Sequence, residues 1–233
     1  KALAAPIVVD ALHDKELRLS MVANNKGRPF KGLRTLLEAM VELNDHRVGL
    51  VLVGNYDDED RVWIESTPVG ADVAFVGETP EAMSYMAGTD VYVLPSWRDA
   101  LPRVVREAMS LSLPTIVSDI PGSRDLILPG QTGLLAPAQD AKALSEAIRW
   151  MLTHPEERRA MGRQGRERIA RDFSPAAFRS SFPLARLVIE SPSAWRQIFV
   201  RMEIYFCAHK KKFHAHENFP PSAQRSDALP HRV

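Results

Sequence analysis

The sequence contains very little cysteine and no long apolar run. Cys207 is the single cysteine among 233 residues, which excludes an intramolecular disulfide and a metal cage made of cysteines alone. No run of about eighteen apolar residues occurs, so the sequence predicts no membrane-spanning helix. Residues 1–10 lack the layout of a secretory signal peptide. We therefore expect a cytoplasmic protein.

The composition is that of an ordinary globular protein, with 45% hydrophobic and 25% charged residues. Its formal net charge of +1 conceals an asymmetry. Residues 174–233 carry nine Lys/Arg against four Asp/Glu, whereas residues 1–173 carry 21 against 25, a net charge of −4. A negatively charged main region argues against a nucleic-acid partner.

Short apolar runs alternate with amphipathic segments along residues 19–173. The runs are typical of buried parallel strands and are Leu19–Ala23, Val48–Val53, Val73–Val76, Val91–Leu94, Thr115–Val117 and Gly133–Leu135. The predicted helices are Gly32–Leu43, Asp58–Ser66, Pro80–Gly88, Pro102–Leu111, Ala141–Leu152 and the charged Pro155–Asp172. Repeated strand–helix–strand units imply right-handed crossovers. The sequence thus predicts a doubly wound, Rossmann-like α/β domain with a parallel sheet of about six strands.

We expect three regions: a linker or remnant at 1–18, the α/β domain at 19–173 and a tail at 174–233. Ser191–Cys207 has enough apolar residues for one helix, and the rest of the tail has no periodicity, which predicts an irregular end. The His- and Lys-rich stretch at 209–216 suggests either a solvated tail or binding of a metal or an anionic surface.

Ligands of open parallel sheets bind beyond the carboxyl ends of the strands. The first segment expected there is Asn24–Gly32, in which Lys26, Arg28 and Lys31 provide three cations before a predicted helix. Side-chain charge and free helix amides act together on an anion, which favours a phosphate-bearing ligand. A solvated basic loop is the alternative.

Two further segments follow the fourth and fifth strands. Asp99 precedes a predicted helix and Glu107 lies inside it, so the two carboxylates are suited to acid/base chemistry or to hydrogen bonds with sugar hydroxyls. Glu107 is also compatible with an ordinary ion pair. Pro121-Gly122-Ser123 marks a tight turn before a short helix expected to start near Ser123.

The segment from Asp99 to Glu107 resembles the E-x7-E segment of family 4 glycosyltransferases. Further segments of the family pattern follow in the same order: Lys31-Gly32, Phe75-Val76-Gly77, Pro95-Ser96, Leu101-Pro102-Arg103, Glu107-Ala108-Met109, Pro114–Asp119, Gly122-Ser123, Thr132–Leu135, Met161-Gly162 and Asp172-Phe173-Ser174. The resemblance covers residues 20–174 and is greatest to bacterial enzymes of lipopolysaccharide and other surface polysaccharides.

The resemblance implies the C-terminal, donor-binding half of a GT-B enzyme. Such an enzyme transfers a hexose, with retention, from a nucleoside-diphosphate sugar to a glycan or lipid-linked acceptor, without a required metal or other cofactor. The implied location is the cytoplasm, with peripheral contact at the inner face of the membrane. The implied catalytic residues are Lys31, Asp99 and Glu107, and the implied donor-binding residues are Lys26, Arg28, Gly32, Gly77, Ala100, Leu101, Glu107, Gly122 and Ser123.

Within this resemblance each residue has an expected role. Lys31, with Lys26 or Arg28, would hold the donor diphosphate. Glu107 would bond the ribose hydroxyls. Asp99 would meet the donor sugar, helped by the backbone of residues 100–101, and the loop after Gly77 would meet the base.

The sequence also departs from the family pattern. Asp99 replaces the usual Glu, Ala100 the usual Gly, and Asp125 a frequent Glu. Residues 1–18 are too few for the acceptor domain, so we expect that half to be missing and the chain to transfer poorly alone. A non-catalytic nucleotide-sugar-binding or partner-docking module is therefore the alternative function.

Two other classes on the same architecture are disfavoured. No Gly-x-Gly-x-x-Gly follows the first strand, as a dinucleotide-dependent oxidoreductase would require. Asp57 and Asp58 follow the second strand without the rest of the acidic pocket of a phosphoacceptor receiver.

Overall fold

The computed structural model describes residues 4–173. Six parallel strands form one sheet in the order β3-β2-β1-β4-β5-β6. The strands are β1 (Leu17–Val22), β2 (Val48–Val53), β3 (Val73–Gly77), β4 (Val91–Leu94), β5 (Thr115–Ser118) and β6 (Gly133–Ala136). The expected fold class is confirmed. The helix expected at 191–207, the His-rich stretch and Cys207 lie outside the described residues.

The α-helices connect the strands in the expected alternation. They are α1 (Leu33–Leu43), α2 (Asp58–Glu65), α3 (Ala82–Ala87), α4 (Arg103–Ser110), α5 (Pro121–Arg124), α6 (Ala141–Thr153) and α7 (Pro155–Asp172). Short 3-10 turns are η1 (Asp10–Leu12), η2 (Pro29–Lys31) and η3 (Gly70–Asp72).

Several element boundaries differ from the expected ones by one to a few residues, and three of these differences have a clear cause or bear on the site. β1 begins at Leu17, because Leu17 and Arg18 continue the ladder opposite the first two residues of β2. Pro102 caps α4 in an extended conformation instead of starting its first turn. The short helix α5 begins at Pro121, so that Ser123 lies within it.

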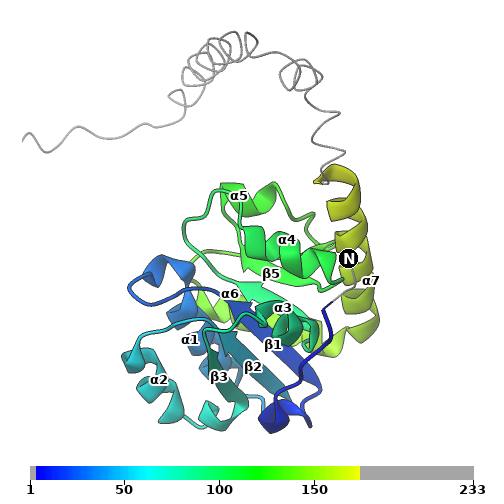
Figure 1. Cartoon of the computed structure of the whole chain (residues 1–233). Helices are drawn as coiled ribbons and strands as arrows, with labels where there is room; N and C mark the ends of the chain where they lie inside the picture. Colours follow the sequence, from blue (N-terminus) through cyan, green and yellow to red (C-terminus); the bar gives the residue numbers. More distant parts are fainter. Residues whose placement is uncertain (1–3, 174–233) are drawn as a thin grey trace, which may run out of the picture. The chain divides into compact units, whose positions relative to one another are not determined.

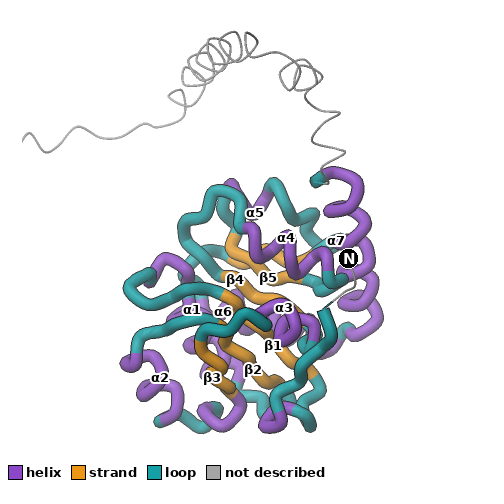
Figure 2. The backbone as a smooth tube through the Cα atoms, in the orientation of Figure 1, coloured by secondary structure: helices purple, strands orange, loops and turns teal. Residues whose placement is uncertain are grey.

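Apolar side chains from both faces of the sheet form the core. Every residue of β2 is buried, as expected for a strand covered on both faces. Helices α1 and α6 pack together on one face, and α3 and α4 cover the other (Figures 1 and 2). Helix α1 has an apolar stripe at helical spacing, and its members are all buried: Leu33, Leu36, Leu37, Met40 and Leu43.

The strand order places a ligand crevice at one point of the sheet. The chain runs outward from β1 to β3, returns, and continues from β4 to β6 on the other side of β1. Ligands of doubly wound sheets bind at this reversal, outside the carboxyl ends of the strands. In this chain the reversal lies between β1 and β4, whose following loops hold the cationic and the first acidic segments.

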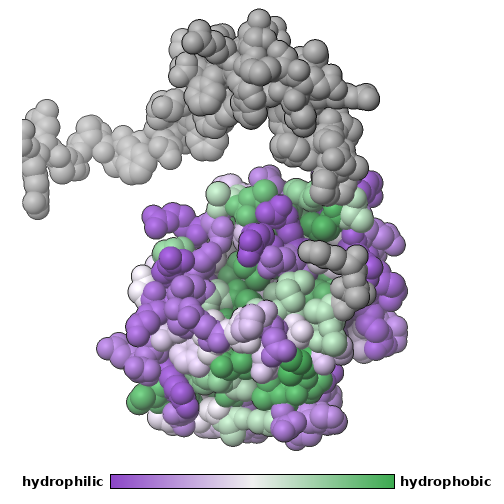
Figure 3. Space-filling view, in the orientation of Figure 1, coloured by the Kyte–Doolittle hydropathy of each residue, from purple (hydrophilic) through white to green (hydrophobic). Residues whose placement is uncertain are grey.

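The face shown in Figure 3 carries both hydrophilic side chains and apolar patches. Among the described residues, the large apolar side chains that stand out to solvent are Val62, Trp97 and Leu101. Trp97 and Leu101 belong to the loop between β4 and α4, on either side of Asp99. Within residues 4–173, no helix has the length and apolar character needed to cross a bilayer.

Candidate functional site

The loop after β1 is fixed against the loop after β4. Gly32 ends η2 with φ of +80°, and a Cβ at this position would lie 2.1 Å from the backbone oxygen of Pro95. Only glycine accepts both this conformation and this approach. The backbone N–H of Trp97 donates to the Phe30 carbonyl at 2.8 Å, and the Arg98 guanidinium lies 5.1 Å from the centre of the Phe30 ring. The first two predicted segments therefore meet.

The third segment packs against the second. Gly122 in α5 is buried, and a Cβ there would lie 2.2 Å from the Ala100 carbonyl oxygen and 2.3 Å from that of Asp99. The backbone that carries Asp99 therefore rests directly on α5. The sequence expectation that three loops converge at the strand ends is confirmed by these contacts.

Gly122→Ala should destabilise the chain by about 1–3 kcal/mol, because backbone atoms cannot move aside as side chains do. Urea unfolding followed by circular dichroism measures the effect. Gly165→Ala is the matched control, since its Cβ would meet atoms at ordinary distances of 3.6 Å or more. The control should unfold at the same or a higher urea concentration, because Ala favours a helix. An equally stable Gly122→Ala variant would contradict the close packing.

Lys31 and Asp99 form an ion pair at the meeting point of the loops. The Lys31 Nζ atom donates to Asp99 Oδ2 at 2.7 Å. The two side chains are only 22% and 16% exposed, so solvent screens the pair less than a surface ion pair. In this structure the cation expected to hold a phosphate is thus neutralised by the carboxylate expected to meet the sugar.

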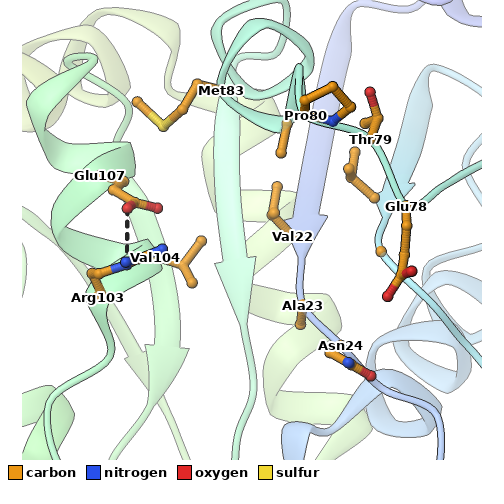
Figure 4. A pocket seen from close by; sticks show the side chains of 13 residues that line it. Val22, Ala23, Asn24, Glu78, Thr79, Pro80, Met83, Arg103, Val104 and Glu107 are labelled. Carbon is orange, nitrogen blue, oxygen red and sulfur yellow. Dashed lines mark ion pairs between the residues drawn. The ribbon is translucent and has the colours of Figure 1, made fainter.

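Glu107 lines a hollow beyond the ends of the strands. The cavity has a volume of about 680 Å³ and lies beyond the carboxyl ends of β1, β2 and β3. Glu107 Oε1 pairs with Arg103 Nε at 3.1 Å, one turn earlier on α4, and both face the cavity (Figure 4). The ordinary ion pair considered from the sequence is therefore present, and the carboxylate remains 33% exposed. Its position allows hydrogen bonds to a ligand in the cavity.

The opposite walls of this cavity come from β1 and from the loop after β3. Val22, Ala23 and Asn24 line one side, and residues 78–80 line another (Figure 4). A volume of about 680 Å³ lies within the range of small-molecule sites. Lys31 and Asp99 do not belong to this lining.

Tyr92 connects the two carboxylates electrostatically. Its hydroxyl is buried in the sheet and donates to the Val22 carbonyl at 3.2 Å. Burial raises the pKa of Tyr92, and the negative charges of Glu107 and Asp99 raise it further. Asp99 lies in the loop after β4 and Glu107 on α4, the helix that follows this loop.

The other cationic candidates lie further out. Arg28 is exposed at the start of η2. Lys26 lines a separate hollow of about 450 Å³ with the acidic residues 57–60, and its backbone N–H donates to Asn55 Oδ1 at 3.4 Å. The structure therefore brings Lys31, but not Lys26, into contact with Asp99.

The remaining candidates lie in β3, in the loop after β4 and in α5. Gly77 ends β3 with φ of +85°, and its carbonyl accepts from the Gly54 N–H at 2.8 Å. Ala100 and Leu101 are exposed in the loop after Asp99. Ser123 is buried in α5. Within residues 4–173, no group of three or more His, Cys, Asp or Glu is placed to hold a metal ion.

Sequence reasoning missed three residues at the site. Tyr92 looked like one more apolar strand residue, although its hydroxyl needs a partner when buried. Glu78 directly follows Gly77, lines the cavity and accepts from Asn55 Nδ2 at 2.8 Å. Arg103 was recognised only as part of a motif, and its spacing of four from Glu107 was the available signal for the ion pair.

The family profile "Glycosyl transferases group 1" matches residues 9–168. The chain belongs to this family. Relatives similar in sequence include bacterial enzymes of surface-polysaccharide biosynthesis. It is 25% identical over 152 residues to the capsular polysaccharide biosynthesis glycosyltransferase CapM of Staphylococcus aureus, covering 62% of this chain and 39% of CapM. It is 26% identical over 154 residues to the lipopolysaccharide core biosynthesis glycosyltransferase LpsE of Rhizobium meliloti, covering 65% and 45%.

Solved glycosyltransferases of the GT-B type share the fold. HepE of Anabaena in complex with UDP-glucose superposes with a TM-score of 0.67 at 18% identity, covering 77% of this chain and 50% of HepE. WaaG, a glycosyltransferase of lipopolysaccharide biosynthesis, gives 0.60 at 22% identity, covering 71% and 50%. The chain therefore spans half or less of the length of these four relatives.

Proposed function

We propose that this chain is the donor-binding part of a family 4 glycosyltransferase. The proposed reaction transfers a hexose, with retention, from a nucleoside-diphosphate sugar to a glycan or lipid-linked acceptor of a cell-surface polysaccharide. The observation that carries the proposal is the Lys31–Asp99 ion pair, which joins the loops after β1 and β4 at the reversal of the strand order, together with the hollow lined by Glu107 beyond the carboxyl ends of the strands. HepE, which shares the fold, is solved with UDP-glucose.

The proposed roles follow from charge and position. Lys31 would exchange its bond to Asp99 for one to the donor diphosphate, close to the first amides of α1. Asp99, once released, would accept hydrogen bonds from the sugar hydroxyls. Glu107 would accept bonds from vicinal ribose hydroxyls in the cavity, since two carboxylate oxygens suit a diol.

The departing nucleoside diphosphate develops negative charge as the glycosidic bond breaks. A fixed ammonium group and helix amides stabilise that charge without having to reorganise during the reaction. The site thus has its own electrophilic groups for the leaving group, and we propose that transfer requires no divalent metal.

Turnover in an enzyme containing this domain should stay within about twofold of its original value after removal of divalent metals by EDTA. Release of the nucleoside diphosphate from a labelled nucleotide sugar measures this. Readdition of Mg²⁺ or Mn²⁺ is the control. A loss of about a hundredfold that either ion restores would show that a metal carries part of the charge stabilisation proposed for Lys31.

Thermal unfolding of the 233-residue chain against a panel of nucleotide sugars tests the proposed function. A donor that binds only the folded state adds about 2.7 kcal/mol of stability at one hundred times its Kd, so its midpoint should rise with concentration. No shift with any nucleoside diphosphate or nucleotide sugar would contradict donor binding.

A non-catalytic donor-binding module is the second candidate, favoured by the changes at Asp99 and Ala100. Both functions predict binding, so turnover decides between them. Labelled donor should be hydrolysed slowly by this chain and transferred by a longer protein that includes an acceptor domain, acting at the cytoplasmic face of the membrane. Binding without either reaction in the longer protein would favour the module.

A further inference from the structure

A third charged hollow lies at the opposite end of the strands from the proposed donor site. It has a volume of about 320 Å³, and it is lined by Thr89, Asp90, Ser112, Leu113, Pro114, Arg158, Arg159 and Arg163. Residues 89–90 directly precede β4, residues 112–114 directly precede β5, and the arginines come from the first half of α7. The hollow therefore lies at the amino ends of the strands, whereas the proposed donor site lies at their carboxyl ends.

Arg158 is a buried cation that faces this hollow. The residue is only 8% exposed, and its Nη1 atom donates to the Met151 carbonyl at 2.8 Å, near the end of α6. No carboxylate of residues 4–173 lies within ion-pair distance of its guanidinium. Burial lowers the pKa of Arg158, and the negative charge of Asp90 only partly opposes this effect. A buried charge is expensive unless it is paired, so this one favours an anionic partner.

The acidic residue of the hollow already has a partner. Asp90 Oδ2 accepts from Arg18 Nε at 3.1 Å and from the Arg18 backbone N–H at 2.8 Å. Its negative charge is therefore balanced by Arg18.

The two other arginines add positive charge at the rim. Arg159 pairs with Glu156, an exposed acid on the same helix. Arg163 is exposed, and in the part of the chain that the structure describes it has no ion pair. The lining is thus net positive, with Arg158 and Arg163 both unpaired by carboxylates.

We propose that this hollow binds the phosphate group of a phosphomonoester. The guanidinium fork matches the oxygens of a phosphate in a bidentate geometry, and two arginines from successive turns of α7 would hold it from one side. The hollow is near the lower limit of small-molecule sites, which suits a small ligand or a head group. A soluble phosphomonoester and a phospholipid head group present the same chemistry.

Titration of glycerol 3-phosphate into the full 233-residue chain by isothermal calorimetry tests the site. Arg163→Gln should weaken binding at least about tenfold, because it removes a charge-assisted contact. Arg158→Met should abolish binding. Arg166→Gln, an exposed arginine on the same helix outside the lining, should leave the affinity unchanged. If Arg158→Met fails to fold, Arg163→Gln still decides the result.

The Lys31→Ala variant distinguishes phosphate binding at this hollow from phosphate binding at the proposed donor site. Binding that Arg163→Gln weakens and Lys31→Ala leaves intact supports the proposal, whether or not nucleotide sugars bind. Binding that only Lys31→Ala weakens places the phosphate at the donor site and overturns the proposal. Absence of heat up to about 10 mM glycerol 3-phosphate, together with no sedimentation on phosphatidic acid vesicles, also overturns it.

The two sources of the phosphate give different results in the same assays. If the ligand is soluble, glycerol 3-phosphate should bind in the calorimeter and the chain should not sediment with phosphatidic acid vesicles. If the ligand is a lipid head group, the chain should sediment with these vesicles, Arg163→Gln should abolish this sedimentation, and Arg166→Gln should retain it. Sedimentation that both variants retain would overturn the assignment to this hollow.

Discussion

Lys31→Ala should lower turnover at least about a hundredfold in an enzyme that contains this domain. The ammonium group is the cation that the fold holds against the loop after β4, and its expected partner in the transition state is the departing diphosphate. Loss of one preorganised contact to developing charge raises the barrier by about 2.7–4 kcal/mol. Each 1.36 kcal/mol is a factor of ten in rate. Initial rates with saturating labelled donor measure the effect.

The control for this variant is Lys142→Ala, which removes an exposed lysine on α6. Its rate should equal that of the original enzyme. Lys31→Ala also leaves the partly buried Asp99 without its partner, so the folded fraction has to be measured by circular dichroism alongside the rate. A folded Lys31→Ala enzyme with an unchanged rate would remove Lys31 from the leaving-group site.

Asp99→Asn should strengthen the binding of a nucleoside diphosphate. A nucleoside diphosphate must displace Asp99 from Lys31, and the carboxylate also repels the phosphates. At 4 Å and an effective dielectric constant near 20, one such charge interaction amounts to about 4 kcal/mol. Because the two side chains are partly exposed, solvent screening reduces this interaction to roughly 1 kcal/mol. The variant should therefore bind UDP or GDP roughly fivefold more tightly than the original chain.

The same substitution should impair the reaction even though it improves nucleotide binding. The Asn side chain offers one acceptor oxygen where the carboxylate offers two, so contacts with the donor sugar should weaken and turnover in a longer enzyme should fall at least about tenfold. Asp14→Asn, at a side chain 83% exposed, is the charge-matched control. Weaker UDP and GDP binding by Asp99→Asn would show that Asp99 does not compete for Lys31.

Local patterns determined the elements that were predicted correctly. Val48–Val53 has only apolar side chains and glycine, which indicates a fully buried strand, and the structure buries every residue of it. The stripe of α1 follows helical periodicity and is buried in full. The helix expected at 155–172 is α7 with the same bounds, because Pro155 favours the first helical turn. These features depend on neighbours in the sequence.

The geometry of the site was predicted less completely than the strands and helices, because it depends on contacts between residues distant in the sequence. Convergence of the three loops followed from parallel-strand topology. The direct bond between Lys31 and Asp99, 68 residues apart, follows from the approach of Gly32 to Pro95, which no local pattern encodes. The resemblance assigned Lys26 to the diphosphate with Lys31, and that role stays a prediction; in the structure Lys26 lines a hollow with the acidic residues 57–60.

In the proposed complex a donor diphosphate replaces Asp99 at Lys31 while the ribose lies against Glu107. A crystal structure of the chain soaked with UDP or GDP, whichever raises the thermal midpoint more, would show this exchange. We expect phosphate oxygens within about 4 Å of Lys31 Nζ, a Lys31–Asp99 separation longer than the present 2.7 Å, and ribose hydroxyls bonded to Glu107. A nucleotide bound elsewhere, with the Lys31–Asp99 bond intact, would contradict it.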